Sequence, residues 1–227
     1  MASFEGKVIA MTGAASGMGL ATAQLLASRG AIISLADINE AAVKDATASL
    51  EHRNGQEHMY SVVDVQSSKG VDSWIETTVQ KLGRLDGAVN MAGIIKHARP
   101  IAESTDEDWE STFAVNARGV YYCLRAQIKA MAPGGSIVSA ASVFGQVGAP
   151  GNAAYCASKA AVIGLIIADG RQREPEHPHQ LRVARFCENT SIRWREPRRR
   201  AAQSSANRAE AESRADRGSA RHRVPAW

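Results

Sequence analysis

Short apolar runs alternate with amphipathic helical patterns along the first 170 residues. The apolar runs predict buried strands, and apolar residues three and four positions apart predict helices between them. Strands separated by helices of this length favour a parallel α/β sheet with helices on both faces. The predicted strands are 7–11, 31–36, 59–63, 85–90 and 135–140, and the predicted helices are 20–27, 40–52, 68–82, two successive ones within 106–131, and 152–168.

The turn after the first predicted strand is rich in glycine. It reads Thr12-Gly13-Ala14-Ala15-Ser16-Gly17-Met18-Gly19 and runs into a helical pattern. A strand, a glycine turn and a helix present backbone N–H groups and a helix N-terminus to a phosphate. Glycine permits both the tight turn and the close approach of a pyrophosphate. Because glycine turns are common, the motif predicts a dinucleotide site through its context rather than alone.

Asp37 ends the second predicted strand, 18 residues after Gly19. An acid near this spacing hydrogen-bonds the ribose of an adenine dinucleotide and repels a 2′-phosphate. Neither Lys nor Arg occurs in the following residues 38–40, so the sequence favours NAD, with NADP as the alternative cofactor. Asp64 follows the third predicted strand and could meet the adenine amino group. For Asp37 and for Asp64 the structural alternative is a cap of the next helix.

Residues with chemical potential lie where the predicted strands end. The carboxyl ends of parallel strands meet at one edge of the sheet, and ligands of such folds bind there. This coincidence predicts one shared site formed by Gly13, Asp37, Asp64, Asn90 and Ser142.

Taken in order, these motifs resemble the short-chain dehydrogenase/reductase family over about residues 4–165. The resemblance rests on the 12–19 turn, Asn90-Met91-Ala92-Gly93, Asn116, Ser142 and Tyr155-(x)3-Lys159. It implies a Rossmann-like, doubly wound parallel sheet and an NAD(P)-dependent interconversion of a secondary alcohol and a ketone, in secondary metabolism. The cofactor contacts that it implies are Gly13, Ser16, Gly17, Met18, Gly19, Asp37, Asp64, Val65, Asn90, Ala92, Gly93, Tyr155 and Lys159.

Tyr155 and Lys159 are one helical turn apart and share a helix face. The pKa of tyrosine is ordinarily about 10, and a nearby ammonium favours the phenolate. The resemblance implies that Tyr155 is the general acid/base, while Lys159 lowers its pKa and holds the nicotinamide ribose. It further implies that Ser142 hydrogen-bonds the substrate oxygen and that Asn116 supports a water relay. The structural alternatives are a packed aromatic, a helix cap and a satisfied core amide for Tyr155, Ser142 and Asn116 respectively.

Two departures from the family pattern stand out. Met91 replaces an asparagine in the family's Asn-Asn-Ala-Gly turn, for which we expect a small effect on cofactor fit. After the Tyr155 helix, neither the remaining family strands nor the substrate lid is found in the sequence. Residues 171–227 contain 14 arginines, 7 acidic residues and no lysine, a composition typical of disorder. We expect an incomplete dinucleotide-binding and catalytic domain over 1–168 and an Arg-rich, disordered tail over 169–227.

The genetic code offers an explanation for the lost pattern. Codons that can encode Asp169 to Ser191, read one nucleotide later, can give T-A-A-K-E-N-P-N-I-R-I-N-C-V-S-P-G-S-V-R-T-P. This string resembles the missing family segment, including its Pro-Gly turn. We hypothesise a change of reading frame near residues 165–168.

The length of the chain, its cysteines and its apolar runs indicate what kind of protein it is and where we expect it in the cell. A chain of 227 residues can bury a core. Cys123, Cys156 and Cys187 lie far apart, which predicts neither a metal site nor a disulfide framework and suits a reducing compartment. The sequence has no apolar run of about 18 residues and no signal-peptide pattern, so we expect a cytoplasmic protein without a membrane partner.

Charge is unevenly distributed along the chain. Residues 1–170 contain 13 basic and 16 acidic residues, whereas residues 171–227 carry a net charge of +7. The tail therefore leaves nucleic-acid binding as the last-ranked alternative, and we expect no nucleic acid, because the tail has few stacking aromatics and no motif. The first alternative is a catalytically inactive nucleotide-binding remnant that lacks the lid.

The expected partners are a small alcohol or ketone and a second copy of the chain. The family often pairs through the helices that contain Asn116 and Tyr155, which implies a homo-oligomer. The substrate itself is not readable from the sequence. An apolar pocket wall is predicted from Ile94, Ile95, Val143, Phe144, Val147 and Pro150.

Overall fold

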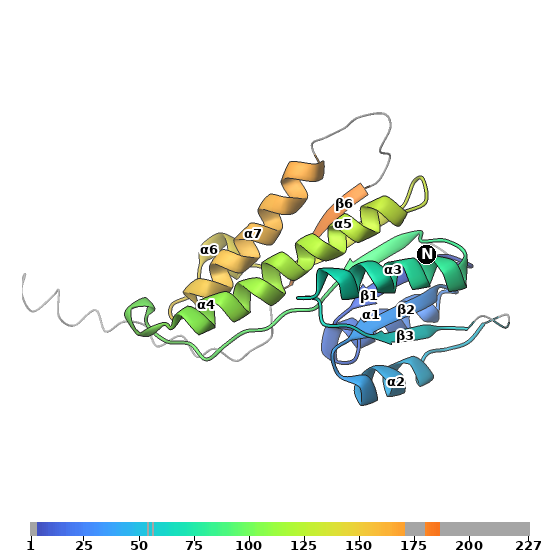
Figure 1. The fold of residues 1–227 in the computed structure, drawn as a ribbon, viewed down its shortest axis with the longest axis horizontal. Helices are drawn as coiled ribbons and strands as arrows, with labels where there is room; N and C mark the ends of the chain where they lie inside the picture. Colours follow the sequence, from blue (N-terminus) through green and yellow to red (C-terminus); the bar gives the residue numbers. More distant parts are fainter. Residues whose placement is uncertain (1–3, 54, 56, 171–179, 187–227) are drawn as a thin grey trace, which may run out of the picture. The chain divides into compact units, whose positions relative to one another are not determined.

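Within the part of the chain that the structure describes, six strands form one parallel sheet in the order β3-β2-β1-β4-β5-β6. The structure is a computed structural model that describes residues 4–53, 55, 57–170 and 180–186 (Figure 1). The predicted parallel α/β fold is therefore confirmed. The strands are β1 Val8–Thr12, β2 Ile32–Asp37, β3 Met59–Val62, β4 Gly87–Asn90, β5 Ser136–Ser142 and β6 Gln180–Phe186.

Helices follow the strands as the sequence pattern predicts. The segment predicted over 106–131 is two α-helices joined by a π-helical turn, η2, over Ala114–Gly119. π-helical turns are rare and occur frequently at functional sites. None of the helices in the described ranges is long and apolar enough to cross a membrane. The other elements are α1 Gly17–Ala27, α2 Glu40–Ala48, α3 Ser68–Leu82, η1 Ile101–Glu103, α4 Asp106–Phe113, α5 Val120–Ala130, α6 Phe144–Val147 and α7 Ala153–Gly170.

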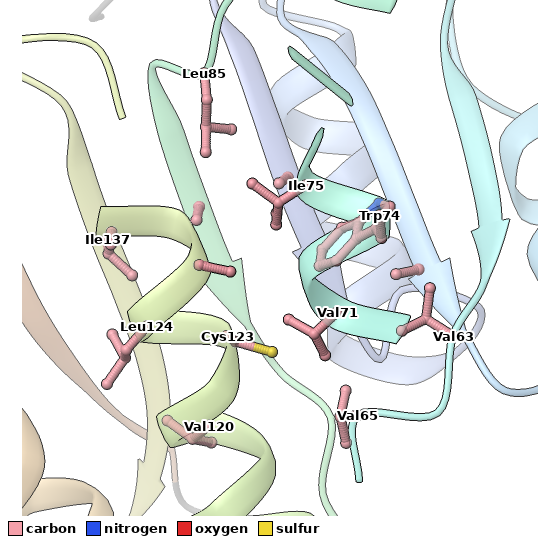
Figure 2. Packing of buried hydrophobic residues seen from close by; sticks show 14 of the residues in the cluster. Val63, Val65, Val71, Trp74, Ile75, Leu85, Val120, Cys123, Leu124 and Ile137 are labelled. Carbon is pink, nitrogen blue, oxygen red and sulfur yellow. The ribbon is translucent and has the colours of Figure 1, made fainter. Parts of the chain in front are cut away.

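Two apolar clusters, one on each face of the sheet, hold the helices in place. On one face, Cys123 of α5 lies on the side of this helix that faces Val71 of α3, and Trp74, Ile75 and Leu124 belong to the same cluster (Figure 2). On the other face, side chains of α1 and α2 pack on β1 and β2, with Met11, Ile33 and Leu35 fully buried. Helices on both faces make the sheet doubly wound, as predicted.

The buried thiol of Cys123 belongs to the first cluster. Burial raises the pKa of Cys123 to about 12, so this side chain behaves as a small apolar group. Within the described ranges, His, Cys, Asp and Glu side chains form no group that could hold a metal ion. Cys187 lies outside the described residues.

β6 is a strand that the sequence analysis did not predict. It pairs with β5 in parallel register along the whole of both strands, from Ser136 opposite Gln180 to Ser142 opposite Phe186. The expectation that no strand follows residue 170 is therefore wrong for residues 180–186. The arginines at 182 and 185 interrupt the apolar run, whereas pairing in the sheet satisfies an edge of β5 that would otherwise be unpaired.

The rest of the predicted tail stays a prediction. Residues 171–179 and 187–227 lie outside the described residues, and so does the composition-based expectation of disorder for them. The proposed division into a domain over 1–168 and a tail over 169–227 accordingly remains a proposal.

His58 gives the sheet a pH-dependent contact just before β3. Its Nδ1 accepts a hydrogen bond from the backbone N–H of Ile33 (3.0 Å), and its Nε2 lies 3.0 Å from the Glu51 carbonyl oxygen. Burial lowers the pKa of His58 below its ordinary value. A protonated Nδ1 could no longer accept the bond from Ile33.

We expect the free energy of unfolding to rise with pH through the histidine range. The unfolded chain, in which His58 has its ordinary pKa of about 6.5, binds more protons there than the folded chain does. The contribution of neutral His58 to the free energy of unfolding is therefore fully present above the pKa that His58 has in the unfolded chain, and it decreases as the pH falls below that value. Urea denaturation at several pH values should show a flatter profile for His58→Gln than for the wild type. His97→Gln, a change at an exposed histidine, serves as the control, and a profile that is identical in His58→Gln would contradict the prediction.

Candidate active site

A cleft of about 560 Å³ lies at the carboxyl ends of β1 to β4. Its lining comes from the glycine turn after β1, the acid that ends β2, the segment after β3 and the turn after β4. The structure thus brings together residues that are far apart in the sequence, from Gly13 to Val115. Of the predicted site residues, the cleft is lined by Gly13, Ser16, Gly17, Met18, Gly19, Asp37, Asp64, Val65, Ala92 and Gly93.

The glycine turn has no space for side chains at two of its positions. A Cβ on Gly13 would lie 2.6 Å from the backbone nitrogen of Ala92, and φ of Gly13 is +62°. A Cβ on Gly19 would overlap the carbonyl oxygen of Gly13. Both glycines therefore permit the backbone of β1, α1 and the β4 turn to come close together. Gly17 also has a positive φ of +52°, but open space surrounds it.

Asp37 joins the glycine turn to the end of β2. One carboxylate oxygen accepts a hydrogen bond from the backbone N–H of Ala15 (3.2 Å), and the other accepts one from Asn39 (3.2 Å). The N-cap of α2 is Asn39 itself, whose side chain accepts from the N–H of Ala42. Asn39, and not Asp37, is therefore the cap of α2. Asp37 remains in the cleft wall with its carboxylate held in place.

Asn90, a predicted cofactor contact, is buried in the core and does not line the cleft. Its side chain is 1% exposed and exchanges two hydrogen bonds with Gln127 of α5, at 2.9 and 2.8 Å. It also donates to Ser139 on β5 (3.2 Å). In the turn that follows, Thr12 Oγ1 accepts bonds from the N–H groups of Met91 and Ala92. The β4 turn is therefore fixed by β1, and Asn90 fixes β4 to α5.

Tyr155 and Lys159 lie in a second cavity, of about 50 Å³. Both are almost fully buried, at 4% and 5% exposed. Lys159 Nζ is 5.7 Å from the centroid of the Tyr155 ring and donates a hydrogen bond to the Ala140 carbonyl oxygen (3.0 Å). The pair on α7 therefore has the geometry that its spacing predicts, with an ammonium held beside a phenol.

Asn116 lies on the π-helical turn η2 and is fully buried. Its Oδ1 accepts from the N–H of Ile94, and its Nδ2 donates to the Ile94 carbonyl oxygen, both at 2.8 Å. Its Nδ2 also donates to Ser158, the residue before Lys159 (3.1 Å). A Cβ on Gly93 would lie 3.2 Å from Asn116 Oδ1 and 3.3 Å from Lys159 Nζ. Asn116 Oδ1 and the Lys159 ammonium therefore both lie beside Gly93.

Ser142 ends β5 and is 2% exposed. Its Oγ accepts a hydrogen bond from the N–H of Phe144, at the start of α6 (3.2 Å). The N-cap of α6 is Val143, so Ser142 bonds to the start of this helix without being its cap. Neither of the two cavities above includes Ser142 in its lining. A role toward substrate remains a prediction.

Several supporting residues escaped the sequence analysis. Gln127, Ser139 and Ser158 each complete a buried hydrogen-bond network around a predicted site residue. Their only sequence signal is a polar residue at a position that the helical or strand pattern assigns to the core. Gln66 and Ile38, which line the cleft, directly follow Val65 and Asp37 and could have been found as their neighbours.

The sheet and its cleft define the class of protein. A doubly wound parallel sheet with a glycine turn, an acid after β2 and a cleft at the strand ends belongs to the Rossmann-like nucleotide-binding folds. The family model for short chain dehydrogenase matches residues 7–187, beyond the end near residue 165 that the motifs alone predict. This chain is a member of the short-chain dehydrogenase family.

Individual relatives agree with this assignment. A short-chain dehydrogenase/reductase named ABA4 from Pyricularia oryzae is 42% identical over 170 residues, which are 74% of this chain and 63% of that protein. Cyclopentanol dehydrogenase from Comamonas testosteroni is 39% identical over 164 residues, or 71% of this chain and 65% of that one. The chain thus spans slightly less than two thirds of the length of these relatives.

A solved structure gives the same picture of the fold. The crystal structure of a short-chain dehydrogenase/reductase from Burkholderia phymatum in complex with NAD superposes with a TM-score of 0.76 at 30% identity. The superposition covers 82% of this chain and 66% of that one.

Proposed function

We propose that the chain is an NAD-dependent oxidoreductase that interconverts a secondary alcohol and a ketone, with NADP as the alternative cofactor. One observation carries the proposal: Met18, Met91 and Gly93 line both the cleft and the Tyr155–Lys159 cavity. A dinucleotide in the cleft would therefore reach the acid/base pair. The Burkholderia phymatum relative with bound NAD supports the choice of cofactor.

The residues of the cleft fit this cofactor. The glycine turn lines the cleft at the N-terminus of α1, where its backbone N–H groups would meet a pyrophosphate. The fixed carboxylate of Asp37 can accept bonds from two ribose hydroxyls. Asp64 and Val65 complete the wall for adenine.

The chain's own residues account for the proton transfer. When bound, NAD takes up or gives the hydride of the reaction. Tyr155 Oη accepts the proton of the substrate hydroxyl in one direction and returns it in the other. The Lys159 ammonium beside the ring favours the phenolate form that accepts this proton. Asn116, which bonds to Ser158 and lies beside Gly93, is proposed to support the water relay to Lys159. Ser142 is proposed to hold the substrate oxygen.

The test is a turnover assay on the purified full chain. NAD⁺ is supplied with a panel of cyclic secondary alcohols that begins with cyclopentanol, and NADH formation is followed by absorbance. We expect turnover with NAD⁺ that exceeds turnover with NADP⁺. NAD binding without turnover of any alcohol would instead favour the inactive nucleotide-binding remnant. That second candidate is favoured by Ser142, whose Oγ accepts a bond from Phe144 and which lines neither the cleft nor the Tyr155–Lys159 cavity.

Asp37 should decide between the two cofactors. In Asp37→Asn the amide keeps an acceptor for the N–H of Ala15 or Asn39 but loses the charge that repels a 2′-phosphate. We expect the ratio of NAD to NADP affinity to fall by about tenfold to a hundredfold, because hydrogen bonds to a charged group contribute about 1.5–3 kcal/mol. Fluorescence titration with both reduced cofactors measures the ratio. Glu40→Gln removes a neighbouring exposed charge and should leave it unchanged; an unchanged ratio in Asp37→Asn would contradict the assignment.

A homo-oligomer is part of the proposal. Trp109 of α4 and Tyr121 of α5 are each 45% exposed, beside small residues of η2 and α7 that line one open groove of about 620 Å³. This face suits a second copy of the same helices, and sedimentation analysis would measure the dimer.

We further propose a cytoplasmic protein that acts on a small molecule of secondary metabolism and has neither a membrane nor a nucleic-acid partner.

A further inference from the structure

Tyr155 lines one further cavity, on a different side from the cofactor cleft. This cavity of about 20 Å³ lies between the segment after β4 and the start of α7, and Lys96, His97 and Arg99 line it. None of the cleft residues Met18, Met91 and Gly93 takes part in it. Its volume is sufficient for about one water-sized group. Tyr155 thus separates the nucleotide side from a basic recess.

The recess keeps excess positive charge. Of the described residues that line it, Asp108 alone is acidic, and its carboxylate lies 3.5 Å from Arg99 Nε, which compensates a single cation. Lys96 and His97 are exposed and, among the described residues, make neither an ion pair nor a hydrogen bond. Their side chains are therefore available to a ligand.

The basic segment is fixed relative to Tyr155. The N–H of Arg99 donates to the Gly151 carbonyl oxygen (2.9 Å), in the turn that leads into α7. Gly151 has a φ of +77°, and a Cβ there would lie 3.1 Å from Ala98 Cβ. This contact holds the basic segment against the first turn of α7, whose N–H groups add positive partial charge.

We infer that the substrate carries a carboxylate, which Lys96 binds together with Arg99 and His97 while the reacting hydroxyl or carbonyl meets Tyr155. This inference rests on the oxidoreductase function proposed above. A carboxylate fits the recess because it is planar and can present one oxygen to the water-sized space. Charge-assisted hydrogen bonds to Lys and Arg supply the recognition.

The test compares 3-hydroxycyclohexanecarboxylate with its uncharged primary amide as substrates for the full chain with NAD⁺. We expect kcat/KM for the acid to exceed that for the amide by about tenfold. Lys96→Gln should remove most of this advantage by lowering kcat/KM for the acid alone. Lys69→Gln makes the same charge change on α3, outside the recess, and should leave both substrates unaffected.

Two results would overturn the inference while leaving the oxidoreductase function intact: equal oxidation of acid and amide, or an equal loss for both in Lys96→Gln. If neither compound is oxidised, the proposed function fails and calorimetric titration of the chain with 3-hydroxycyclohexanecarboxylate decides the inference separately. Weaker binding to Lys96→Gln than to Lys69→Gln supports the carboxylate site. Equal binding to the two variants, or no binding to the wild type, refutes it.

Discussion

Replacing Tyr155 by phenylalanine should lower kcat by about a hundredfold to ten-thousandfold, the usual contribution of a positioned general acid/base. The substitution removes only the hydroxyl, and the ring can keep its place beside Lys159 in a position that is 4% exposed. The cofactor cleft does not include Tyr155 in its lining, so the affinity for NADH should remain within about twofold of the wild type. Steady-state kinetics and fluorescence titration measure the two quantities.

Tyr60→Phe provides the control, because Tyr60 lies on β3 and is 38% exposed. It makes the same chemical change far along the sheet from α7 and should leave kcat unaffected. Full turnover in Tyr155→Phe would remove Tyr155 from the mechanism. A loss of turnover together with a loss of NADH binding and of stability would indicate a packing role instead.

Gly19→Ala should abolish detectable NAD binding and destabilise the fold. The new methyl group would overlap the Gly13 carbonyl oxygen, and backbone on both sides leaves no flexible neighbour to move aside. Overpacking of this kind costs about 1–3 kcal/mol in unfolding free energy. The shift of α1 away from β1 also disrupts the phosphate site at the helix N-terminus. Thermal unfolding and cofactor titration report the two effects.

Gly164→Ala is the matched control. It makes the same substitution within a helix, α7, where the added Cβ meets no atom of its own chain within 4 Å. Because Gly164 also lines the groove proposed for a second copy, sedimentation analysis first establishes that the variant keeps the oligomeric state of the wild type. Because alanine has the higher helix propensity, we expect stability to stay equal or to rise by up to about 1 kcal/mol. Wild-type NAD affinity in Gly19→Ala would show that the close approach of the two glycines is not needed.

Local patterns in the sequence predict most of the site. The glycine turn, Asp37 and the Tyr155–Lys159 spacing each reflect the geometry of a single turn or helix, which short segments dictate. The order of strands and helices then places these segments at one edge of the sheet, because right-handed parallel connections leave little choice. The cleft accordingly contains ten of the predicted cofactor residues.

What the sequence did not predict depends on contacts between distant segments. β6 pairs with β5 through backbone groups, and because two arginines interrupt its apolar residues, the hydrophobic pattern did not predict this strand. The burial of Asn90 away from the cleft follows from Gln127, 37 residues further on. No local rule predicts the π-helical turn at Asn116, and the side-chain amide of this residue bonds to the backbone of Ile94, 22 residues earlier. In each case the partner becomes visible only in three dimensions.

The hypothesis of a changed reading frame remains to be tested. Sequencing of the transcript across the codons for Gly164 to Ser191 would reveal an inserted, deleted or unspliced stretch. A transcript that encodes the sequence as given would refute the hypothesis.

The reciprocal amide pair between Asn90 and Gln127 constrains how this protein can evolve. Each side chain satisfies the other inside the core, so a change at either position leaves a buried amide without its partner, at a cost of about 1–3 kcal/mol. An apolar pair of similar volume would remove both amides together and leave only the Ser139 hydroxyl without its bond to Asn90, but it is reached only through one of these unfavourable single changes. Natural variation at the two positions should therefore be correlated, and lineages that have altered one should have altered the other.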